Sequence, residues 1–143
     1  MTPAEVAAFL RRHHTMALAT HGPGGFPHVV AMSYGFVGDR LAFWGDRRSQ
    51  KIVNLQRDGR LGCLVDDGDD HGELQGVHLA GVAEFVADPD ELAALGRAVL
   101  AQRFGPDGDP GAFPAPLEQL VAHRIGVRIR VERTVSWDHR KRP

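Results

Sequence analysis

The segment from Phe43 to Lys51 collects residue types that could bind an anion. It leads from an expected strand into an expected short helix, and it carries Arg47, Arg48, Ser49 and Lys51. A helix start presents unpaired backbone N–H groups and a partial positive charge, so it attracts negative groups. Cations at that end are unfavourable unless an anion or solvent screens them. The spacing therefore indicates a phosphate site, and the alternative is a solvated basic turn.

Other combinations of reactive residues are weaker. The eight histidines are scattered, without a pair at the helical spacing of a metal site, so we expect no bound metal. A heme-handling role for His78, which lies in the middle of an expected strand, is a lesser alternative. The acidic run from Asp66 to Glu73 lacks the spacing of a calcium loop. No Ser–His–Asp set is identifiable.

Cys63 is the only cysteine, which excludes an internal disulfide and a thiolate zinc site. It lies in the apolar run from Leu61 to Val65 and is expected to be a small core residue.

The composition fits one domain over residues 1–143. Apolar residues make up 43% of the chain and the formal charge is −1. This balance argues against a nucleic-acid partner and against electrostatic binding to a membrane. The first residues do not resemble a signal peptide, and no apolar segment is long enough to span a bilayer, so a cytoplasmic location is expected.

The periodicity predicts a mainly β (β+α) fold, an antiparallel barrel of about six strands with peripheral helices. Helices are expected at Pro3–Arg12, from Ser49 to Asp58, and from Asp88 through Phe104. The expected strands are Thr15–Thr20, Pro27–Phe36, Leu41–Trp44, Leu61–Val65, Leu74–Val86 and Ile125–Val131.

Four short motifs occur in an order that resembles a known family. They are Phe43-Trp44-Gly45 followed after three residues by Ser49-Gln50-Lys51, the run His28–Ser33, the region of Gln75 and Gly76 with Gly81 and Glu84, and Trp137 within Val135–Asp138. The chain from Leu10 to Trp137 thus resembles the pyridoxamine-phosphate-oxidase-like split-barrel flavoproteins, including their deazaflavin-dependent relatives.

The resemblance implies a split barrel that binds a flavin-type cofactor, either deazaflavin (coenzyme F420) or FMN, at a homodimer interface. It implies that Lys51 and Ser49 hold the phosphate with help from Gln50 and Arg47, and that Trp137 reaches the cofactor from the partner subunit. The remaining expected contacts are Trp44 and Gly45 at the ribityl chain, Val30 and Met32 or their neighbours at the ring, and His28, Ser33 and Gln75.

Two departures from the family pattern refine these expectations. The oxidases have Arg at the positions of Gln50 and His28, and Ser-Gln-Lys followed by Asn54 looks more like the deazaflavin-using branch. The Arg-x-His motif that follows the C-terminal Trp in pyridoxamine phosphate oxidases is missing, because the sequence ends at Arg142-Pro143. A true pyridoxamine phosphate oxidase activity is therefore not expected.

The expected function is an oxidoreductase that transfers hydride to or from a small conjugated substrate. No catalytic residue is identified, although Tyr34 and His28 are candidate proton donors. The loop Gly105–Pro116 is expected to shape the substrate pocket. The alternative is a non-catalytic flavin-binding or tetrapyrrole (heme)-binding protein of the same fold.

Overall fold

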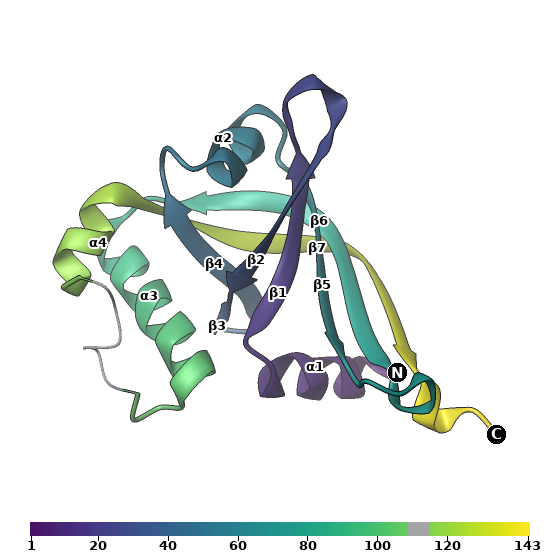
Figure 1. Ribbon diagram of the computed structural model, residues 1–143. Helices are drawn as coiled ribbons and strands as arrows, with labels where there is room; N and C mark the ends of the chain where they lie inside the picture. The colour runs from purple at the N-terminus through teal and green to yellow at the C-terminus, as the bar shows by residue number, and fades with distance from the viewer. Residues whose placement is uncertain (109–114) are drawn as a thin grey trace.

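A seven-stranded antiparallel sheet forms the body of the protein and curves into a half-barrel (Figure 1). The computed structural model describes residues 1–108 and 115–143. The strands are β1 (Thr15–His21), β2 (Pro27–Ser33), β3 (Gly35–Val37), β4 (Arg40–Asp46), β5 (Arg60–Asp67), β6 (Gln75–Val86) and β7 (Arg124–Asp138), in the order β2-β1-β5-β6-β7-β4-β3. Within the expected loop Gly105–Pro116, residues 109–114 lie outside the described residues.

The sheet has seven strands where about six were expected, because the expected strand Pro27–Phe36 forms two. β2 pairs with β1 up to Ser33, and β3 pairs with β4 from Gly35 onward. Tyr34 lies between them, where its backbone N–H donates to the carbonyl of His14. One apolar run therefore supplies both edges of the open sheet.

The helices surround this sheet. They are α1 (Pro3–Arg12), α2 (Gln50–Arg57), α3 (Pro89–Phe104) and α4 (Leu117–His123). Thr2 caps α1 and Asp88 caps α3, as expected from their side chains. In Figure 1, α3 and α4 lie together beside β4, whereas α1 and α2 lie at opposite ends of the sheet.

Two apolar clusters hold these layers together. The larger lies inside the curved sheet and includes Phe43, Tyr34 and Cys63, so the core position expected for Cys63 is confirmed. Burial raises the pKa of its thiol to about 12. The smaller cluster lies between β4 and the α3–α4 pair and is centred on Trp44.

The structure adds two features that were not expected. β7 continues past Val131 to Asp138, because the long β6 accepts it as a partner across an irregularity at Ala80/Gly81. The second feature is α4, which follows the Pro/Gly-rich segment.

The outer face of β1, β2, β5 and β6 carries mainly small or apolar residues. The strand register places Ala17, Ala19, Val29, Ala31, Gly62, Leu64, His78 and Ala80 on this face. The adjoining strand β7 adds Val135 and Arg133. Val29 is 60% exposed and Val135 is 39% exposed. This sheet face is therefore mainly apolar, and no helix among the described residues covers it.

Candidate functional site

The end of β4 and the start of α2 bring Lys51 against a glycine. A Cβ placed on Gly45 would lie 2.9 Å from Lys51 Cε and 3.3 Å from Cγ1 of Ile52. Gly45 therefore provides the space in which the half-buried Lys51 side chain lies. The sequence motif places these two residues at one site, and the structure brings them into contact.

The turn before α2 is fixed by its own polar groups. Ser49 Oγ donates to the carbonyl of Asp46 at 2.7 Å, and the Arg48 N–H donates to Asp46 Oδ1 at 2.8 Å. Ser49 is the N-cap residue, but its side chain makes no capping hydrogen bond. The first N–H groups of α2 are therefore left without a side-chain cap, in a position suited to an acceptor from outside the helix.

Lys51 shares its surroundings with a second cation that the sequence did not reveal. Burial lowers the pKa of Lys51, nearby Arg124 lowers it further, and Asp46 partly opposes both effects. Burial also lowers the pKa of Arg124, again opposed by Asp46. Arg124 reaches this corner because it pairs with Asp46 in the β4–β7 register. Two half-buried cations thus face one carboxylate, and a bound anion would stabilise both.

A buried polar network ties α2 to the sheet. Asn54 is fully buried, and its Nδ2 donates to Thr20 Oγ1 at 3.0 Å. Its Oδ1 accepts from Gln50 Nε2 at 2.6 Å and from Arg57 Nη2 at 3.2 Å. Arg57 also donates to the carbonyl of His21. The side chain of Gln50 is thereby held along the helix, so its amide is oriented before any ligand binds.

β2 presents three of the expected residues on the side that faces α2. His28 pairs with Thr20, the residue that contacts Asn54, and alternation puts Val30 and Met32 on the same face. Val30 and Met32 are partly buried against the main core. In the described part of the chain, Nδ1 of His28 is buried without a hydrogen-bond partner. A buried nitrogen of this kind is available to a ligand group.

Other expected contacts are placed differently. Trp44 is 5% exposed, with its ring under α3 against Gly96 and 4.9 Å from the Arg124 guanidinium carbon. Its ring therefore supports the site from the core side and is not open to a cofactor. Ser33 lies on the opposite face of β2 from Met32 and accepts a hydrogen bond from Arg103 of α3. Arg47 is exposed, and its N–H donates to the carbonyl of His123.

Gln75 and Trp137 lie at the other end of the sheet from Lys51. Gln75 is buried, and its Nε2 donates to Asp138 while its Oε1 accepts from Arg12. Trp137 pairs with Gly76 and packs over it. β7 separates Trp137 from Arg124 by roughly 40 Å of strand, at ~3.3 Å per residue. One chain therefore does not bring these two residues to Lys51.

The suggestion that Tyr34 donates a proton is wrong. Its side chain is fully buried and its hydroxyl donates to the carbonyl of Leu10 at 2.7 Å. Burial raises the pKa of this hydroxyl well above its usual value. Tyr34 is a core residue that joins α1 to the start of β3.

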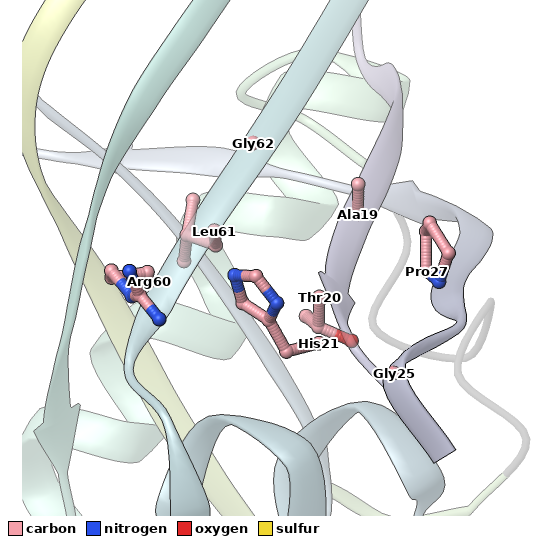
Figure 2. Close-up of a pocket in the computed structure, with 8 residues that line it drawn as sticks. All are labelled: Ala19, Thr20, His21, Gly25, Pro27, Arg60, Leu61 and Gly62. Carbon is pink, nitrogen blue, oxygen red and sulfur yellow. The ribbon is translucent and has the colours of Figure 1, made fainter. Parts of the chain in front are cut away.

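A cavity of about 370 Å³ opens on the sheet beyond the C-terminal end of α2 (Figure 2). The residues that line it are Ala19, Thr20, His21, Gly25, Pro27, Arg60, Leu61 and Gly62. Figure 2 shows the His21 ring between Arg60 and Thr20. Arg60 donates two hydrogen bonds to Asp58, at 3.0 Å and 2.7 Å, so its charge is already paired. This cavity therefore lacks the excess positive charge found at Lys51.

Within the described residues, His, Cys, Asp and Glu form no group of three or more that could hold a metal ion. The helices in these same ranges lack the length and apolar character needed to cross a bilayer.

The sequence profile of the pyridoxamine 5'-phosphate oxidase family matches residues 2–138. The chain belongs to this family. The seven-stranded half-barrel and the solved structures that resemble it agree with the split-barrel fold of the family. No curated protein matches the chain.

Several solved structures share this fold. The conserved hypothetical protein Rv2991 from Mycobacterium tuberculosis is 42% identical, with a TM-score of 0.88, over 99% of this chain and 87% of that one. An F420 reductase is 24% identical, with a TM-score of 0.70, over 90% and 94% of the two chains. HutZ, the heme storage protein from Vibrio cholerae, is 16% identical, with a TM-score of 0.70, over 95% and 93%. The fold thus occurs in proteins named for a deazaflavin and for heme.

Proposed function

We propose that this chain is an oxidoreductase that binds a phosphate-bearing flavin-type cofactor, with the phosphate at the start of α2. The observation that carries the proposal is the pair of half-buried cations, Lys51 and Arg124, whose pKa values are both lowered. Asp46 opposes both shifts. A phosphate there would accept hydrogen bonds from Lys51 and from the uncapped N–H groups of α2, which are stronger when the acceptor is charged.

The residues around this corner fit such a group. Gly45 leaves room for Lys51, and the buried Nδ1 of His28 offers a further hydrogen-bonding atom on the α2-facing side of β2. Val30 and Met32 pack against the core, so in this proposal their neighbours on the outer face of β2, Val29 and Ala31, supply the apolar surface for a ring. In this proposal Gln50 contributes its backbone N–H group, since its side chain already bonds Asn54. Ser49 shapes the turn, because its hydroxyl and its backbone N–H both donate to the carbonyl of Asp46.

We also propose that the site is completed by a second copy of the chain. Trp137 and Gln75 lie at the far end of the sheet from Lys51, and Trp137 sits on the apolar outer face. A homodimer built on that face would cover Val29 and Val135, which are exposed in one chain. It would also let Trp137 of the partner approach the cofactor.

A bound flavin or deazaflavin would supply hydride transfer at its central ring. The chain's own residues then bind the phosphate, orient the ring and exclude water. No protein acid is required for the hydride itself. His28 is the titratable side chain nearest in sequence to the proposed ring surface, and it is the remaining candidate for holding a proton.

Deazaflavin is favoured over FMN. Gln50 and His28 replace two arginines of the oxidase pattern, so fewer cations face the phosphate than a tight FMN site would use. Coenzyme F420 bears its phosphate in a diester, which carries a smaller charge than the FMN monoester.

The test is a pair of fluorescence titrations with each cofactor and its phosphate-free form, using wild type and Lys51→Ala. Loss of one charged hydrogen bond should weaken the phosphate-bearing form by roughly 1.5–3 kcal/mol and leave the phosphate-free form nearly unchanged. Arg48→Ala is the matched control, since Arg48 is an exposed cation of the same turn. Equal losses for both forms would show that Lys51 does not contact the phosphate.

A non-catalytic tetrapyrrole-binding role is the second candidate. It is favoured by His78 on the outer face of the sheet, whose Nε2 would lie 3.4 Å from a Cβ on Gly62. Heme binding would give a Soret band that His78→Ala removes. If heme leaves the spectrum unchanged, or the band survives this substitution, the role is excluded.

A further inference from the structure

His13 joins the C-terminal end of α1 to the end of β5. It is the residue that follows α1, and its Nδ1 contacts the carbonyl oxygen of Phe9 at 2.8 Å. Its Nε2 contacts Asp67 Oδ2 at 3.0 Å, at the end of β5. The ring also packs against the Phe9 ring, with the two centroids 4.3 Å apart. One imidazole therefore connects two segments that are 54 positions apart in the sequence.

Both contacts of the His13 ring are with oxygen atoms that only accept hydrogen bonds. A carbonyl oxygen has no proton to donate. Asp67 is ionised, because hydrogen bonds from His13 and from the Gly68 N–H lower the pKa of its carboxyl group. A neutral imidazole has one N–H and could satisfy only one of the two oxygens. The observed geometry therefore requires a ring that carries both protons.

The surroundings suit this charged ring. The C-terminal end of a helix attracts positive charge, and His13 lies there. The side chain that α3 brings to this place is uncharged, since Gln102 Nε2 donates to the His13 carbonyl. The charged side chains around the pair come from α1, from the turn before β6, and from the end of β7 and the residues after it: Arg12, Glu73, Asp138 and Arg140. Arg140 is paired with Asp138 at 2.8 Å, so the carboxylate of Asp67 is left for His13.

The same end of the sheet carries Trp137. The register sets three residues side by side at the ends of β5, β6 and β7: Asp67, Gln75 and Asp138. Arg12, which precedes His13, donates to the Gln75 side chain. The connection 68–74 leaves the sheet at this point, and its first N–H, on Gly68, donates to Asp67 Oδ1 at 2.8 Å. The orientation of one carboxylate therefore links α1 to this connection.

We propose that His13 is a proton-dependent clamp that holds the connection 68–74 and the adjoining end of the sheet, with Trp137, in place. When the ring loses its second proton, one of its nitrogens faces an oxygen without a hydrogen between them, and α1 releases one of its two contacts. Histidines lose this proton as the pH rises through neutrality, so the clamp holds in mild acid and opens in mild alkali. The effect on a cofactor bound by the partner subunit, through Trp137, rests on the proposed function.

The test follows the cofactor-free wild-type protein by NMR from roughly pH 5 to pH 8. Ring nitrogen shifts report how many protons His13 carries, and hydrogen exchange reports the protection of the Gly68 and Glu73 amides. We expect both ring nitrogens to be protonated at ~pH 6. As the ring becomes neutral, the protection factors should fall by about three- to fivefold, the size expected for a partly exposed ion pair.

Three variants separate the clamp from general effects of pH. Asp67→Asn removes the anion and should lower the protection at every pH, without a step; its side chain is 57% exposed, so this variant should fold. His13→Lys keeps a cation that does not titrate in this range and should retain the protection in mild alkali. His14→Gln is the matched control, because the ring of His14 contacts Thr15 Oγ1 and should not affect the step.

A His13 ring with a single proton at ~pH 6 would overturn the proposal, as would an unchanged step in Asp67→Asn. Cofactor titrations form a separate arm, in which wild type should bind more weakly at ~pH 8 than at ~pH 6 and His13→Lys should not. A cofactor that binds wild type equally at both values would overturn the link to Trp137. If the ring and amides respond as expected but neither flavin nor deazaflavin binds, the clamp is supported and the proposed function fails.

Discussion

At the scale of single residues, the candidate site depends on the packing of the Lys51 side chain into the space that Gly45 leaves free. The glycine lets the lysine fold back across the strand end, and Arg124 then limits where its ammonium group can lie. This arrangement places the charge at the start of α2 and partly shields it from water. A lysine that extended freely into solvent would keep its ordinary pKa.

Gly45→Ala tests this packing. The new methyl group would lie 2.9 Å from Lys51 Cε, so the flexible lysine must move. We expect affinity for the phosphate-bearing cofactor to fall by up to about 1.5–3 kcal/mol, the value of the charged hydrogen bond that the displaced lysine would lose, while thermal stability changes little because the lysine is flexible. Gly72→Ala is the matched control, because a Cβ there meets nothing within 4 Å. Unchanged affinity in Gly45→Ala would show that the position of Lys51 is unimportant for binding.

At the scale of elements, the helix ends are set by residues close in sequence, whereas the pairing of the strands is set by contacts between residues far apart in sequence. Pro3–Arg12 was predicted with its observed bounds, because Thr2 can cap the helix and Pro3 suits the first helical position. The structure adds a capping box between Thr2 and Glu5. The division of Pro27–Phe36 into two strands could not be predicted, because periodicity is the same for residues that pair with β1 and with β4. The position of Arg124 likewise follows from strand register, which joins it to Asp46 across 78 positions of sequence.

The same distinction applies to the site. The motif from Gly45 to Lys51 is local, so the sequence could place these residues together. Trp44 was expected at the cofactor, but alternation along β4 puts its ring under α3, which only the tertiary structure reveals. The distance between Trp137 and Lys51 depends on the length of β7, which was underestimated because its exposed second half lacks regular apolar alternation.

The two ends of the chain are joined by a salt bridge that should respond to pH. Lys141 Nζ contacts Glu5 Oε1 at 2.6 Å, and the pKa of Glu5 is lowered from 4.5 to about 2, chiefly by this contact. Because the folded-state pKa is depressed, its stabilising contribution is present above pH 4.5 and is lost as the pH falls toward about 2. We expect Lys141→Gln to lower the melting temperature at neutral pH, with the difference from wild type vanishing in acid.

Arg142→Gln is the control for this prediction. Arg142 is exposed and adjacent to Lys141, so this substitution removes one positive charge without touching the salt bridge. Thermal unfolding followed by circular dichroism across this pH range is the measurement. A constant difference between Lys141→Gln and wild type at every pH would mean that Glu5 ionisation is not involved.

At the scale of the whole molecule, the proposed site needs two chains, and a mixing experiment can show this. Lys51→Ala and Trp137→Ala each damage one half of the site. If the halves come from different subunits, a mixed dimer contains one intact site, formed by Lys51 of one chain and Trp137 of the other. We expect tight cofactor binding to reappear when the two weakened variants are mixed under conditions that allow subunit exchange.

The mixing experiment distinguishes a site formed by two chains from a site formed within one chain. If both halves belonged to one chain, every site in the mixture would carry a lesion and binding would not return. Light scattering on each variant must show a dimer before mixing. A wild-type chain that stays monomeric would contradict the two-chain site directly.

The central claim is that a phosphate lies at the start of α2 with Lys51 as its main counter-ion, and a crystal structure with bound coenzyme F420 or FMN tests it most directly. The account predicts a phosphate oxygen within ~2.7–2.9 Å of Lys51 Nζ, as in other charge-assisted hydrogen bonds. A cofactor whose phosphate lies elsewhere, with Lys51 contacting only protein or solvent, would contradict it.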